Sequence, residues 1–139
     1  MISGVTYYFK VAECGYDLTI TGLDQATKDE LLKTHNEKRQ KVASGSETGQ
    51  PGASNMRKLT WNDELAEIAQ RWAGQCSFGH DETRNLCDGT LVGQNAYQGE
   101  ADYGQYDYDL NPAIGDAVNA WYNEVTNPGF ASSNINPFV

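Results

Sequence analysis

The segment from Gly74 to Cys87, "GQCSFGHDETRNLC", carries the residues best suited to chemistry. It contains two of the three cysteines, Cys76 and Cys87, and one of the two histidines, His80. Thiolates and imidazoles bind zinc, so these residues and Cys14 could form a Cys3His site. The spacing C-x3-H-x6-C differs, however, from the usual paired C-x2-4-C knuckle. A disulfide anchor beside an unrelated histidine is the other interpretation.

The same segment raises the hypothesis of a hydrolase. A cysteine hydrolase would pair Cys76 or Cys87 with His80, but it also needs an orienting group and an oxyanion hole. A serine hydrolase would combine His80 and Glu124 with a nucleophile such as Ser77. Closeness in sequence does not establish that geometry. A metal- or thiol-dependent, protease-like hydrolase using His80 and Glu124 is therefore the alternative to a binding protein.

Charge and hydropathy exclude several classes of partner. The net charge of −9 disfavours nucleic acids and anionic membranes. No apolar run approaches the ~20 residues that a membrane span needs. Residues 1–22 lack the basic start and apolar block of a signal peptide. In a secreted chain, an odd number of cysteines indicates an intermolecular bond, a free thiol or a missing partner.

The first helix is predicted to follow an extended N-terminal arm, residues 1–26, which contains the β-prone run "VTYYFKV". Thr27 and Glu30 form a capping box that predicts a helix start at Thr27. Gly45 then supplies the left-handed end. This helix carries a polar set that we expect to orient it rather than to bind a ligand: His35, Asn36 and Arg39.

A second helix is predicted after the cap Asn62, with an apolar stripe from Leu65 to Cys76 at helical spacing. A third is predicted to open at Asn111-Pro112 and to end at 127–129. Only one core strand, 90–98, is evident. The acidic, tyrosine-rich stretch 99–109 is interpreted as a solvated loop. We expect the three tryptophans to belong to the core: Trp61, Trp72 and Trp121.

Four motifs together resemble the CAP superfamily, and in particular its antigen-five venom-allergen branch. They are "THNEKRQKVA", "NMRKLTWNDELAEIAQRWAGQCSFGHD", "VGQNAY" and "AWYNEV". They occur in the order typical of the family, and the resemblance extends from about Cys14 to Val125. It divides the chain into the arm, 1–26, and a partial CAP (SCP-like) domain, 27–139.

The resemblance implies an α+β fold, a secreted α-β-α sandwich with helices on both faces of a central antiparallel sheet. Here the domain is expected to be dominated by helices, because the later strands of the sheet are missing. The family's second cavity histidine, in a G-H-[FY]-T-Q-type motif, is missing as well. We therefore expect either a fragment or a truncated member with an incomplete site.

The resemblance also assigns residues to a surface cavity. His80 matches the first cavity histidine, Gln94 stands at the first acidic position, and Glu124 matches the second acidic residue. Such a cavity can hold a divalent metal such as zinc, for which His80 and Glu124 are the candidate ligands here, although no cofactor is required. By the same match Cys14 pairs with Cys76, closing a loop of about 60 residues and contributing on the order of 4 kcal/mol. Cys87 is left without a partner.

No general enzymatic activity belongs to the family, although proteolysis has been claimed for some members. We therefore expect a secreted, extracellular, non-enzymatic protein of venom-allergen type that acts by binding a small lipid, a metal or a host protein. The step from fold to role is an analogy. A third hypothesis is a structural role, in which an open sheet edge pairs with another chain.

Overall fold

The computed structural model describes residues 3–10, 23–75, 77–100 and 110–131. Side chains are described for these residues except 3–10, 99–100, 110–113 and 128. The elements follow in the order β1 (Ser3–Lys10), α1 (Gln25–Ala43), α2 (Asp63–Ala73), β2 (Gly93–Glu100), α3 (Leu110–Asn123) and a π-helical turn, η1 (Val125–Gly129). The expected 99–109 loop lies almost wholly outside this part of the chain.

The two strands pair in parallel, from Ser3 opposite Gly93 to Lys10 opposite Glu100. The antiparallel sheet that the family resemblance implies is therefore wrong for this strand pair. Parallel strands require a long crossover, and the chain provides one because α1 and α2 both lie between β1 and β2. The expected core strand, 90–98, is confirmed as a strand but begins three residues later, at Gly93.

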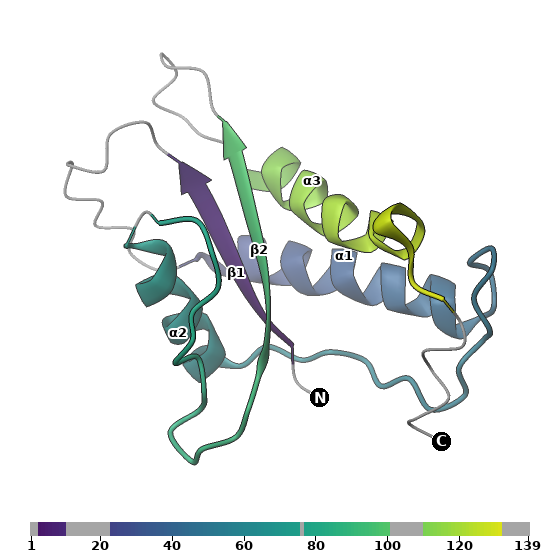
Figure 1. The fold of residues 1–139 in the computed structure, drawn as a ribbon, viewed down its shortest axis with the longest axis horizontal. Coiled ribbons are helices and arrows are strands. Elements are labelled where there is room, and N and C mark those ends of the chain that lie inside the picture. The colour runs from purple at the N-terminus through teal and green to yellow at the C-terminus, as the bar shows by residue number, and fades with distance from the viewer. Residues whose placement is uncertain (1–2, 11–22, 76, 101–109, 132–139) are drawn as a thin grey trace.

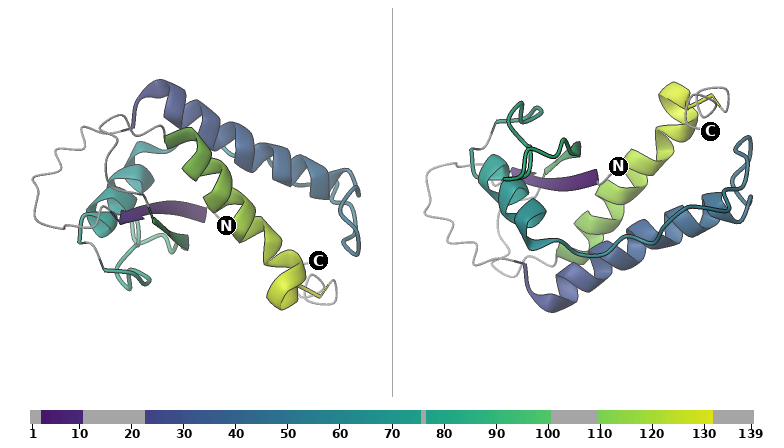
Figure 2. Two further views of the ribbon diagram at one scale, coloured as in Figure 1. Left: turned by 90° about the horizontal axis from the view of Figure 1, so that it is seen from above. Right: turned by 90° about the horizontal axis from the view of Figure 1, so that it is seen from below.

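The helices lie on both sides of this strand pair (Figure 1). Helix α2 packs beside β1, while α3 packs beside β2 and α1 packs on α3. This order of helix, strands and helix is compatible with the α-β-α sandwich. Both views in Figure 2 show α1 and α3 close together at one end and diverging toward their carboxyl ends.

Helix α1 begins earlier than its sequence predicts. Its cap is Asp24, whose carboxylate accepts a hydrogen bond from the backbone N–H of Thr27 at 2.7 Å. The predicted capping box of Thr27 and Glu30 is therefore wrong, and Glu30 pairs with Lys33 instead, at 3.0 Å. Asp24 caps the helix in place of Thr27 because aspartate is also a strong N-cap residue and its negative charge interacts favourably with the helix dipole. The end at Gly45, with φ of 74°, is confirmed.

Helix α2 follows its predicted pattern. Asn62 caps it by accepting from the N–H of Leu65 at 2.9 Å. Leu65, Ile68 and Ala69 are buried. Cys76, which the stripe places at the buried end, lies outside the described residues.

Helix α3 begins at Leu110, one residue before the predicted opening at Asn111. It ends at Asn123 rather than continuing through Val125, and the η1 turn follows. The backbone of Asn127 is not helical, with φ of −144°, and Pro128 follows it. Proline disfavours helical backbone geometry at the residue that precedes it, and this accounts for the break in the turn at Asn127.

A small apolar core joins α1 to α3. Leu31 of α1 packs with Ile114 and Val118 of α3, which are 1% and 4% exposed. Trp61 and Trp121 pack against this cluster, as the sequence predicts. Each indole N–H has an acceptor; that of Trp121 donates to the carbonyl of Ala96 in β2 at 3.0 Å.

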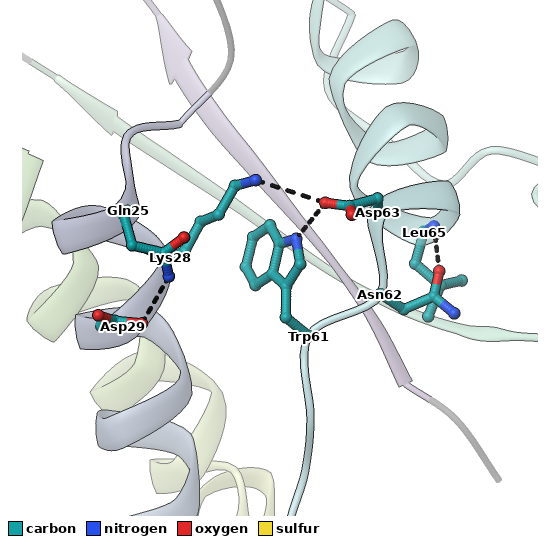
Figure 3. Close-up of polar contacts among 7 residues, drawn as sticks. All are labelled: Gln25, Lys28, Asp29, Trp61, Asn62, Asp63 and Leu65. Carbon is teal, nitrogen blue, oxygen red and sulfur yellow. Dashed lines mark hydrogen bonds and ion pairs between the residues drawn. The ribbon is translucent and has the colours of Figure 1, made fainter.

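The starts of α1 and α2 are tied together by one carboxylate (Figure 3). Asp63 accepts from the indole N–H of Trp61 at 2.9 Å and from the Lys28 ammonium at 3.4 Å. The same ammonium lies 5.2 Å from the Trp61 ring centroid, a cation–π distance. The Trp61 hydrogen bond, more than that of Lys28, lowers the pKa of Asp63.

Two residues of the predicted polar set, Asn36 and Arg39, bond α1 to the segment before α2. Asn36 donates to the carbonyl of Leu59 at 3.2 Å and accepts from its N–H at 2.8 Å. Arg39 donates twice to the carbonyl of Arg57, at 3.0 and 2.7 Å. These bonds replace the backbone pairing that the irregular segment before α2 lacks, so they fix its path along α1.

Replacing Asn36 by alanine should therefore destabilise the protein. Asn36→Ala leaves the half-buried N–H and C=O of Leu59 without these partners, and we expect a loss of about 1–3 kcal/mol in the free energy of unfolding. Urea denaturation followed by circular dichroism measures it. Gln40→Ala, at an exposed position of the same helix, should stay within about 0.5 kcal/mol of the unmodified chain. Equal losses in both variants would contradict the proposed clamp.

Candidate functional site

His80 and Gln94, two of the three predicted cavity residues, are in contact. His80 lies on the loop after α2, and Gln94 is the second residue of β2. The Nδ1 atom of His80 is 3.0 Å from the amide oxygen of Gln94, which also accepts from the backbone N–H of Asp81 at 2.9 Å. Because this oxygen can only accept, His80 must donate from Nδ1. In the neutral ring, Nε2 is then the unprotonated nitrogen.

The loop that carries His80 is held by side chains that bond to backbone carbonyls. Arg84 donates to the carbonyls of Asp81 and Val92, at 2.6 and 3.0 Å. The indole of Trp72 donates to the carbonyl of Gly79 at 2.9 Å. The imidazole is thus presented at the surface by a loop with defined internal contacts.

The third predicted residue is Glu124. It follows α3 and lines a hollow between α1 and α3, whereas Gln94 borders a much smaller hollow beside α2. The described residues contain no group of three or more His, Cys, Asp or Glu side chains placed to hold a metal ion. A tetrahedral zinc site needs more protein ligands than His80 alone. The described residues therefore do not fit the metal that the resemblance implies. The ligand pair His80 and Glu124 stays a prediction.

Of the three cysteines, only Cys87 lies among the described residues. Cys14 and Cys76 lie outside the described residues, so their pairing stays a prediction. Cys87 is a free, exposed thiol. Its backbone N–H donates to the carboxylate of Glu64 at 2.7 Å, and a hydrogen bond to this carboxylate raises the pKa of the Cys87 thiol. A raised pKa disfavours the thiolate that nucleophilic catalysis requires.

The hollow that Glu124 lines was not predicted from the sequence. It lies where α1 and α3 diverge, and its volume is about 620 Å³. It is lined by Val42, Gln50, Pro51, Gly52, Ala53, Met56, Trp121, Tyr122, Glu124, Val125, Gly129 and Phe130. No pattern in the sequence indicates that the segment after α1 forms a wall of this hollow.

A buried carboxylate contacts Tyr122, one of the residues that line this hollow. Glu47, on the loop after α1, is only 8% exposed. It accepts from the Lys41 ammonium at 2.6 Å and from the Tyr122 hydroxyl of α3. These hydrogen bonds, that of Lys41 first, lower the pKa of Glu47. Burial, together with the Glu47 contact, raises the pKa of Tyr122. At neutral pH the carboxylate is therefore charged and the phenol protonated.

Comparison with known proteins assigns the family. The sequence profile of the cysteine-rich secretory protein family, CAP, matches residues 32–136. The chain belongs to this family. It is 44% identical over 126 residues to Venom allergen 5 of Vespa mandarinia, covering 86% of this chain and 59% of that protein. It is 45% identical over 123 residues to Scoloptoxin SSD43 of Scolopendra dehaani, covering 86% of this chain and 54% of that protein.

The CAP chain thus spans somewhat more than half the length of these curated relatives, and no solved structure matches it. Its relatives make it a CAP protein of venom-allergen type. Among the described residues, no helix combines the length and apolar character needed to cross a membrane.

His35, the other histidine, sits in the interface between α1 and α3. Its Nδ1 lies 2.8 Å from the carbonyl of Leu31, so Nδ1 donates, and its ring centroid is 6.0 Å from that of Trp121. Its Nε2 is buried without a hydrogen-bond partner. Burial, with a smaller effect from the Arg39 cation, lowers the pKa of His35 below 6.5. A proton on Nε2 would have no acceptor.

The titration of His35 tests this packing. Its midpoint should fall below 6.5 in NMR spectra of the imidazole signals, with His80→Ala used for assignment. Because the folded state then binds the proton less well than the unfolded state, the free energy of unfolding should decrease as the pH falls below 6.5. A His35 midpoint above that value would mean that its ring is not buried in this interface.

Proposed function

We propose that this CAP protein acts by binding, and that its ligand is a small lipid held in the hollow between α1 and α3. The observation that supports this proposal most strongly is the hollow itself. Its volume of about 620 Å³ is within the range of small-molecule sites, roughly 300–1,000 Å³. A concave wall suits a compact apolar molecule better than the flatter surface of a protein partner.

The lining supports an apolar ligand. The aliphatic and aromatic side chains of the lining come from four segments. They are Val42 of α1, Met56 of the segment between α1 and α2, Trp121 of α3, and Val125 and Phe130 at the two ends of the η1 turn. Phe130 is 48% exposed, so apolar surface at the rim is available to a ligand. Burying such surface is favourable by about 25 cal/mol per Å².

A hydrolase has less support from the described residues. His80 uses Nδ1 to contact Gln94, and Glu124 borders a different hollow. The thiol of Cys87 is disfavoured as a thiolate by Glu64. We therefore assign His80 and Gln94 the role of shaping the loop after α2. The proposal includes secretion, with a Cys14–Cys76 bond anchoring the N-terminal arm.

A matched pair of substitutions tests the lipid site. Ala53 lines the hollow, whereas Ser54, the next residue, is exposed and outside it. Ala53→Trp should weaken binding of dansyl-undecanoic acid by about tenfold or more, because the indole fills space that the ligand needs. Ser54→Trp, which adds an equally large side chain next to it, should leave the affinity unchanged.

Probe fluorescence measures both affinities on the full chain, and circular dichroism confirms that each variant is folded. Failure of the unmodified chain to bind the probe would refute the lipid site. So would an equal affinity of the two variants for the probe.

A further inference from the structure

The loop after α1 has the construction of a lid. Its base is closed, because the N–H of Ala53 donates to the carbonyl of Ala43 at 3.1 Å. The backbones of Gly45 and Gly52 also meet there, since a Cβ atom on Gly52 would come within 3.4 Å of the Gly45 nitrogen. Larger side chains would hold this base apart. The loop between Ala43 and Ala53, residues 44–52, is therefore a compact unit attached to the end of α1.

The far side of this loop is bonded to residues on the opposite wall of the hollow. Glu47 accepts from the Tyr122 hydroxyl of α3, and Gln50 donates to the carbonyl of Phe130 after η1, at 2.8 Å. These two hydrogen bonds join the loop to the opposite wall. Gln50 itself lines the hollow, as do its neighbours Pro51 and Gly52.

The other contacts of Glu47 remain on its own side. Lys41, its ion-pair partner at 2.6 Å, belongs to α1, and the loop is braced internally by the Gln50 N–H donating to the Glu47 carbonyl at 3.1 Å. If the loop moved away from α3, the Glu47 carboxylate would keep its lysine and gain water. Such a movement avoids the large penalty of leaving a buried charge unpaired.

Two lysine ammonium groups lie over the ring of Tyr122. The ammonium groups of Lys38 and Lys41 lie 5.0 and 5.4 Å from the centroid of its ring, both within cation–π range. The ring therefore stays in the wall of the hollow while its hydroxyl holds the loop. The raised pKa of Tyr122 and the lowered pKa of Glu47 keep the donor and the acceptor in their bonding forms at neutral pH.

From these contacts we infer that residues 44–52 form a gating lid over the apolar hollow, latched by the Glu47–Tyr122 and Gln50–Phe130 hydrogen bonds. The inference rests on the proposed lipid site and adds its regulation: ligand enters and leaves when the two latches open together. Opening breaks two hydrogen bonds and leaves the base of the loop in place, so it is a local motion.

Stopped-flow kinetics of dansyl-undecanoic acid on the full chain tests the lid. Tyr122→Phe removes one latch but keeps the ring in the wall, and Gln50→Ala removes the other. Each substitution should raise both the association and the dissociation rate constants. For Tyr122→Phe, which removes the latch to the buried Glu47, we expect an increase of about tenfold. Because a lid gates entry as well as exit, the dissociation constant should change much less than either rate. Thr48→Ala, at an exposed position on the same loop, is the matched control and should leave both rates unchanged.

The outcomes separate the lid from the site. Faster dissociation with unchanged association would mean that Tyr122 only contacts the ligand, and would overturn the lid. Unchanged rates in both variants, with normal binding, would overturn the lid and leave the lipid site standing. An unmodified chain that binds no probe would refute both proposals. If Tyr122→Phe proved unfolded by circular dichroism, Gln50→Ala, which leaves the core intact, carries the same test.

Discussion

The packing of α3 on α1 is the contact on which the rest of the structure depends. Ile114 and Val118 meet Leu31 in the most buried cluster of the described residues. This contact lies near one end of the helix pair. Beyond it they diverge, as both views in Figure 2 show, and the space between them becomes the hollow. This cluster thus joins the helix pair at one end, and the proposed site lies beyond it.

The irregular segments depend on a different interaction, the bond from a side chain to the backbone. Asn36 and Arg39 fix the segment before α2, and Arg84 and Gln94 fix the loop before β2. Two paired strands cannot satisfy the polar groups of such long connections, so buried or half-buried polar side chains do it. This explains why motif residues such as Asn36 and Gln94 have structural roles here.

The sequence predicts the features that a local signal determines. The stripe after Asn62 identifies α2, and the polar set around Asn36 is correctly assigned to orienting a helix. The start of α1 is missed because Asp24 and Thr27 are both good caps, and sequence alone does not rank them. The parallel strand pair is missed because register and direction depend on distant segments. The hollow is missed because four separate segments contribute to its wall.

Four sequence motifs predict the family, but they predict only part of the arrangement of the site. His80 and Gln94 do meet, whereas Glu124 follows α3 and lines the hollow between α1 and α3. Sequence motifs identify which residues belong together in a family and do not fix the geometry of a particular chain.

The central claim is that the hollow between α1 and α3 is the binding site, and NMR shift mapping tests it most directly. Dansyl-undecanoic acid would be titrated into the uniformly ¹⁵N-labelled chain. The account predicts that amide shifts change in segments 50–56 and 121–130, which line the hollow, and not in the 77–94 segment around His80. Shifts centred on 77–94, or no shifts at all, would contradict it.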